Sequence, residues 1–147
     1  MQRLKTRPQF QAAMAGGTVA RTAHFALHRL VLGVGAAVET GPGLLRAEGP
    51  QVLFGVPDVW LGAMVPKRWA RRAVTRNAIK RQIYGVAAVF EPRLPAAAHV
   101  VRLRTAFDRK LFVSASSDLL KQAVRSELLQ LFERAATRAD AFAQVRA

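Results

Sequence analysis

The feature that most constrains this chain is a stretch from about Arg71 to Phe90, whose residue types repeat at helical spacing. At about 100° per residue, its apolar side chains fall in one arc of roughly 120°: Ile79, Ile83, Val86, Val89 and Phe90. A separate arc of about 140° carries the polar ones: Arg76, Asn77, Lys80, Arg81 and Tyr84. The following "EPRLP" ends the helix, because prolines cannot continue it. We therefore predict a helix with one packing face and one basic face.

The basic face has no acidic counterpart nearby. Residues 67–81 contain seven Lys or Arg, and no Asp or Glu occurs from Val59 to Phe90. Cations four residues apart on a helix repel each other, and the whole chain carries a formal charge of +14. A solvated face is the usual interpretation of mixed Lys and Glu, but here the charge favours a polyanion. Nucleic acid is preferred to an anionic membrane surface or a merely solubilising surface, since phosphates pair well with Arg.

The order of elements predicts an α+β fold. Strands are expected at 24–32, 59–65 and 98–104, and helices at 9–15, 71–90 and from about Asp118, after a Ser116 or Ser117 N-cap. A mixed central sheet with helices, in one domain spanning 1–147, accounts for this order and length. Residues 33–58 are rich in Gly and Pro and indicate a variable insertion of turns, in which 51–56 could form an edge strand. The tail from about Asp140 is expected to fray.

No catalytic or metal-binding constellation is recognisable in the sequence. The chain has no cysteine, its nine acids are scattered, and its three histidines lack metal-ligand spacing. Trp69 could stack on a base or anchor the start of the basic helix. With no apolar run of about 20 residues, the chain is expected to be a soluble cytoplasmic protein.

The segment "KRWARRAVTRNAIKR" resembles the signature of the bacterial ribonuclease P protein component, an Arg-Asn-x-x-Lys-Arg helix that follows a strand and a basic turn. The likeness extends to "RL", Phe10, Gly17 and Phe25 near the N-terminus and to "HVVRLR" at 99–104. It implies a ribosomal-protein-like fold with a left-handed β-α-β crossover. This hand departs from the usual rule for parallel strands, and periodicity alone does not give it.

The resemblance also implies site residues. Those that match the RNA-binding turn and helix are Lys67, Arg68, Arg71, Arg72, Arg76, Asn77, Lys80 and Arg81. Phe10 matches an aromatic that contacts the single-stranded 5′ leader of precursor tRNA, and Met14 and His28 stand where other cleft aromatics are common. Ala78 and Tyr84 occupy positions that are frequently basic in the family.

The implied function is that of the non-catalytic protein subunit of ribonuclease P. Its partners would be the catalytic RNA and precursor tRNA, with no membrane, and removal of the 5′ leader would depend on magnesium held with the RNA subunit. No cofactor would be bound by the protein alone. The alternative is a structural RNA-binding protein of the ribosome or a general RNA chaperone, and a membrane-surface amphipathic protein is a third possibility.

Overall fold

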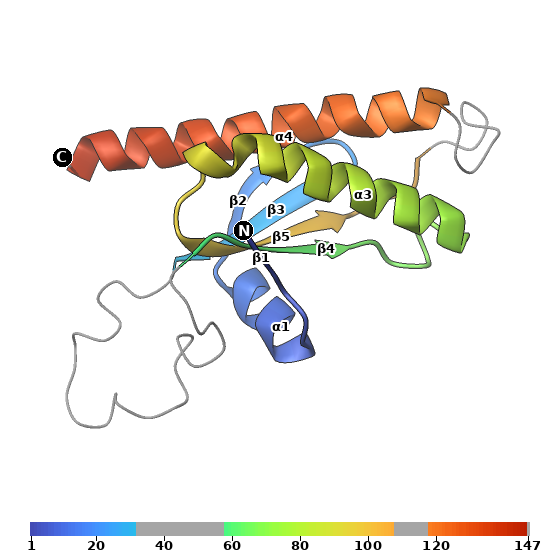
Figure 1. Ribbon diagram of the computed structural model, residues 1–147, viewed down its shortest axis with the longest axis horizontal. Helices are drawn as coiled ribbons and strands as arrows, with labels where there is room; N and C mark the ends of the chain where they lie inside the picture. The colour runs from blue at the N-terminus through green and yellow to red at the C-terminus, as the bar shows by residue number, and fades with distance from the viewer. Residues whose placement is uncertain (32–57, 108–117, 147) are drawn as a thin grey trace.

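The computed structural model describes residues 1–31, 58–107 and 118–146, with side chains described as far as Thr137. Five strands form one mixed sheet in the order β1-β4-β5-β3-β2 (Figure 1). The strands are β1 (Gln2–Arg3), β2 (Thr18–Arg21), β3 (Phe25–Val31), β4 (Trp60–Met64) and β5 (Ala97–Leu103). β1 and β5 both run parallel to β4, whereas β3 is antiparallel to β5 and to β2.

Helices cover both faces of the sheet. α3 (Ala73–Phe90) and α4 (Asp118–Arg146) lie side by side on one face, and the shorter α1 (Arg7–Ala15) lies on the other (Figure 1). A short 3₁₀ turn, η2 (Glu91–Arg93), follows α3 before the chain enters β5. The mixed α+β prediction is confirmed. The parallel strands β4 and β5 are connected through α3 and form the β-α-β crossover. The left hand of this crossover stays a prediction.

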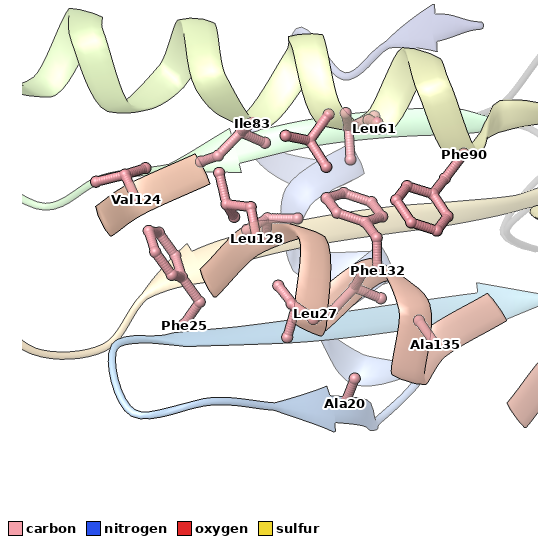
Figure 2. Close-up of a cluster of buried hydrophobic side chains, with 14 of the residues drawn as sticks. Ala20, Phe25, Leu27, Leu61, Ile83, Phe90, Val124, Leu128, Phe132 and Ala135 are labelled. Atoms are coloured by element: carbon pink, nitrogen blue, oxygen red, sulfur yellow. The ribbon is translucent and has the colours of Figure 1, made fainter. Parts of the chain in front are cut away.

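The main core lies between the sheet and the α3–α4 layer. Figure 2 shows Leu61, Ile83 and Leu128 converging there from β4, α3 and α4. The rings of Phe90 and Phe132 stack with centroids 5.9 Å apart and join the C-terminal end of α3 to the middle of α4. Each fully buried side chain of this size contributes about 1.5–3 kcal/mol by leaving water. The α3–α4 layer is therefore held firmly on the sheet.

A smaller core lies under α1. It consists of Leu4, Ala13, Ala98 and Val100, with Phe10 and Met14 packed against it. Thr6 begins the helix with a capping box, in which its hydroxyl accepts from the Gln9 backbone and the Gln9 side chain accepts from the Thr6 backbone. At the other end, a Cβ at Gly16 would lie 2.2 Å from the Arg29 carbonyl oxygen. A larger residue there would push α1 away from β3.

Most predicted elements are observed, with specific differences. The basic helix starts at Ala73 rather than Arg71, and Val89 is 62% exposed although the periodicity predicted it on the packing face. α4 continues through Arg146, past the predicted fraying point. β1 and β2 were not predicted. The possible strand at 51–56 and the Ser116 or Ser117 cap lie outside the described residues.

One buried polar chain crosses the sheet beneath α4. Arg29 Nε donates a hydrogen bond to His99 Nε2 over 3.1 Å, and His99 Nδ1 donates to the Trp60 carbonyl oxygen over 3.2 Å. This arrangement requires a neutral imidazole, because Nε2 acts as an acceptor. Burial, and then the charge of Arg29, lower the pKa of His99 from 6.5 to about 4. His99 is thus a buried structural group.

Candidate nucleic-acid interface

The basic turn that precedes α3 is a compact structure anchored by Trp69. The backbone amides of Trp69 and Ala70 both donate to the Pro66 carbonyl oxygen over 3.1 Å. The Trp69 ring is half-buried and packs against the main core, while the Arg68 guanidinium lies 5.2 Å from its ring centroid. Trp69 therefore serves as the anchor that was one of its two predicted roles. Its packing leaves Lys67 and Arg68 exposed.

Arg76 folds back over the start of its own helix. Its Nη1 donates to the carbonyl oxygens of Ala70, over 3.0 Å, and of Arg71, over 2.7 Å. These bonds tie the first turn of α3 to the basic turn and fix the direction of the chain between them. Arg76 is therefore at least in part a positioning residue for its neighbours Arg71 and Arg72, which are exposed.

The N-terminus of α3 concentrates positive charge. The N-cap residue is Arg72, whose side chain makes no capping hydrogen bond, and the first turn contains no acid. The helix dipole also places partial positive charge at this end, and this charge repels the positive charges of Arg71 and Arg72. Phosphate is the kind of group that relieves such an arrangement, because helix N-termini bind anions through free backbone N–H groups.

Further along α3, the polar face borders a hollow of about 580 Å³. Its lining residues are Arg3, Asn77, Lys80, Arg81, Tyr84 and Gly85. Arg3 comes from β1, and its guanidinium lies 4.1 Å from the centroid of the Tyr84 ring. The structure thus brings the predicted residues Asn77, Lys80 and Arg81 together along one surface.

The predicted leader-binding residues lie on the opposite face of the sheet, which α1 covers. Phe10 and Met14 are half-buried on α1. His28 is only 7% exposed, and it pairs across the sheet with Val100 of the smaller core. Its Nδ1 lies 3.1 Å from the Thr18 hydroxyl, and its Nε2 accepts from Arg102 over 3.4 Å. Burial, followed by the charges of Arg102 and Arg21, lowers the pKa of His28.

The sequence pattern does not identify two cations that lie near these surfaces. Arg3 was seen only as part of "RL", although the alternation of exposed Arg3 with buried Leu4 is typical of a strand. In the sequence, Arg102 is recognisable only as part of a strand, yet in the fold it lies beside His28. Neither position has a local pattern that identifies its neighbour across the sheet, since that neighbour comes from a distant segment.

The fold and this surface define a single α+β domain that presents a cationic helix free of acidic residues. The family model described as Ribonuclease P matches residues 1–136, and the chain belongs to that family. Within the described residues, no helix is both long enough and apolar enough to cross a membrane.

Curated relatives carry the same family name. The ribonuclease P protein component of Ralstonia pickettii is 31% identical over 131 residues, which cover 89% of this chain and 76% of that protein. That of Burkholderia mallei is 35% identical over 88 residues, covering 58% of this chain. The chain spans only 65% of the length of this Burkholderia relative.

Solved structures share the fold. The Staphylococcus aureus RNase P protein superimposes with a TM-score of 0.60 at 19% identity, covering 90% of this chain and 94% of that one. The RNase P protein from Thermotoga maritima gives a TM-score of 0.55 at 20% identity, covering 91% of this chain and 97% of that one. At this level of identity the likeness concerns the arrangement of elements, and the roles of individual residues rest on the geometry described above.

Proposed function

We propose that this chain is the protein subunit of ribonuclease P and binds the catalytic RNA through the basic turn and the polar face of α3. The observation that carries this proposal is the acid-free cationic surface, in a chain of this family, that starts at an uncapped helix N-terminus. The residues assigned to RNA binding are Lys67, Arg68, Arg71, Arg72, Arg76, Asn77, Lys80 and Arg81. Arg76 also holds the turn in place.

The opposite face of the sheet is the proposed contact for the 5′ leader of precursor tRNA. Phe10 and Met14 form the apolar part of this face, and His28 with Arg102 forms its polar part. A half-buried Phe10 can offer only part of its ring to a base, because the other part packs on β4. Since the sheet separates this surface from α3, leader and catalytic RNA would be bound by different faces.

Catalysis in this proposal belongs to the RNA. Magnesium held with the RNA supplies the hydrolytic chemistry, and the protein stabilises the assembled complex by neutralising phosphates. The basic surface is not suited to hold magnesium itself, because Mg²⁺ prefers oxygen ligands and this surface presents cations. The assembly would act in the cytoplasm.

The proposal is tested by reconstitution. Purified protein is added to ribonuclease P RNA from the same genome and to precursor tRNA, at a magnesium concentration too low for the RNA alone. Restored release of the 5′ leader is the expected result. Lys80→Ala should weaken the effect, and Lys121→Ala is the matched control, since Lys121 is an exposed lysine on α4. No stimulation at any protein concentration would contradict the proposal.

The same assay separates the alternative functions. A ribosomal RNA-binding protein or a general RNA chaperone would bind RNA through similar charge but would not stimulate this cleavage specifically. Competition with an unrelated structured RNA of equal length measures that difference. Equal affinity for both RNAs would favour the chaperone.

A further inference from the structure

We propose that the hollow between β1 and α3 holds one unpaired nucleotide of the bound RNA, with its base stacked on the Arg3–Tyr84 pair. The inference rests on the proposed RNA-binding function and adds a contact to a base where the helix surface alone would contact only phosphates. The volume of about 580 Å³ lies within the roughly 300–1,000 Å³ typical of small-molecule sites.

The stacking platform is already assembled in the free protein. Arg3 lies 4.1 Å from the Tyr84 ring centroid, and the pairing of Arg3 with Leu61 in β4 fixes the position of its backbone. Tyr84 is half-buried and packs against the main core, which restrains its ring. Guanidinium planes and aromatic rings both stack on splayed RNA bases. A base entering this hollow therefore meets a surface that needs little rearrangement.

Gly85 supplies the second observation. Neither packing nor backbone conformation requires a glycine here, because a Cβ at this position would meet nothing within 4 Å and Gly17 alone among the described residues has a positive φ. A glycine inside a helix nevertheless costs about 0.5–1 kcal/mol relative to alanine. Its missing side chain keeps the hollow open and allows a ligand to approach the helix backbone closely.

Charge identifies the class of ligand. Lys80 and Arg81 border the hollow together with Arg3, and no ion pair to a carboxylate involves these three in the part of the chain that the structure describes. Asn77, one turn earlier on α3, adds an amide that can both donate to and accept from a base edge or a ribose hydroxyl. Cations for the phosphates, a stacking platform and one amide together fit a nucleotide.

Tyr84 is the only tyrosine of the chain, so it provides a direct probe. In protein carrying ¹³C-labelled tyrosine, the single set of ring signals is followed by NMR during titration with a nine-nucleotide single-stranded RNA. The control is an abasic ribose-phosphate chain of the same length and charge. We expect an upfield ring-current shift with the RNA and none with the abasic chain. Equal shifts for both, or no shift at saturation, would overturn base stacking.

A second experiment uses ribonuclease P RNA itself. Gly85→Leu fills the hollow with a residue that favours helix, and Ala88→Leu adds the same side chain at an exposed position outside its lining. We expect Gly85→Leu to weaken RNA affinity by about 5-fold or more, as loss of one stacked base predicts. Its melting temperature should not fall, and the salt dependence should keep the wild-type slope. Ala88→Leu should bind like wild type.

The outcomes separate the two proposals. Wild-type protein that fails to bind ribonuclease P RNA specifically overturns the proposed function. Wild-type protein that binds, with Gly85→Leu equal to it, overturns only the nucleotide subsite. A Gly85→Leu variant with a flatter salt slope shows that the hollow holds phosphate alone, which also overturns the subsite.

Discussion

The ring of Phe10 fills the space beside Gly62 in the middle of β4. A Cβ on Gly62 would lie 2.5 Å from Cε1 and 2.7 Å from Cζ of Phe10, and 2.8 Å from Cδ1 of Leu4. Glycine is unusual inside a strand and often marks a close approach of another group. Here that group is the side chain that docks α1 onto the sheet.

Gly62→Ala should therefore destabilise the protein. Overpacking at this contact is expected to cost about 1–3 kcal/mol of unfolding free energy, measured by urea denaturation. Gly85→Ala is the matched control, because its new Cβ meets nothing and should add up to about 1 kcal/mol through helix propensity. Equal effects of the two substitutions would contradict the packing described for Phe10.

Phe10→Ala tests the leader contact. If Phe10 stacks on a leader base, the substitution should cost about 1–3 kcal/mol in binding precursor tRNA with a 5′ leader and almost nothing for leaderless tRNA. If its role is packing alone, the melting temperature falls and both substrates are weakened alike. Affinities for both substrates and the melting temperature, measured on one variant, separate these outcomes.

Arg76 and Lys80 should respond differently to alanine. Lys80→Ala should flatten the slope of log affinity against log salt by about 0.7–0.9 and leave the melting temperature unchanged, since it removes a phosphate contact. Arg76→Ala should also lower the unfolding free energy by about 1 kcal/mol, because it removes two hydrogen bonds to the basic turn. Identical melting temperatures for both variants would show that the fold-back of Arg76 contributes nothing to stability.

His99 should make stability depend on pH. Its pKa is about 4 in the folded protein because of burial and the nearby Arg29, against 6.5 for an unperturbed histidine. The unfolded chain therefore binds the proton more tightly. The contribution of neutral His99 to the free energy of unfolding is complete above about pH 6.5 and is lost as pH falls toward 4. Between pH 7 and pH 5 the loss is about 2 kcal/mol.

His99→Gln provides the control, since an amide can accept from Arg29 and donate to the Trp60 carbonyl oxygen without titrating. The unfolding free energies of both proteins at pH 7 and pH 5 are compared. We expect a clearly smaller loss in the variant, and parallel losses would assign the pH dependence to other groups.

Residues 33–56 should be replaceable by a short linker. Val31 pairs with Ala97 and Trp60 pairs with Ala98, so β3 and β4 flank the start of β5 on its two sides. Val31 and Trp60 therefore lie about two strand spacings, or about 10 Å, apart. About six Gly and Ser residues span this gap, and loop closure depends only weakly on length. The shortened protein should keep a cooperative thermal transition, and loss of that transition would show that residues 51–56 are needed.

The sequence predicted best what depends on local periodicity. Ile79, Ile83 and Val86 are buried as their helical spacing indicates, because a packing stripe follows directly from the geometry of a helix. Val89 lies at the edge of the apolar arc and is 62% exposed, whereas the next residue, Phe90, is buried. The spacing gives the direction of the packing face but not how wide a part of it the neighbouring elements cover.

The surface was less predictable where it depends on distant segments. Lys80 and Arg81 were recognised from their own run of sequence, whereas the contact of Arg3 with Tyr84 exists only because β1 pairs with β4. The fold-back of Arg76 onto Ala70 was missed for a different reason. A long side chain can point to solvent or to its own backbone, and spacing does not distinguish the two.

The pairing of β1 with β4 also affects how the chain matures during translation. Gln2 leaves the ribosome well before its partner Trp60 and before the lining residues of α3. Long-range parallel pairing is slow, because the intervening chain must first be brought together. β1 therefore cannot pair until β4 has been synthesised. A nascent chain that ends before Tyr84 cannot yet present the assembled hollow to RNA. The order of synthesis thereby delays RNA binding at this hollow until most of the sheet and α3 have been made.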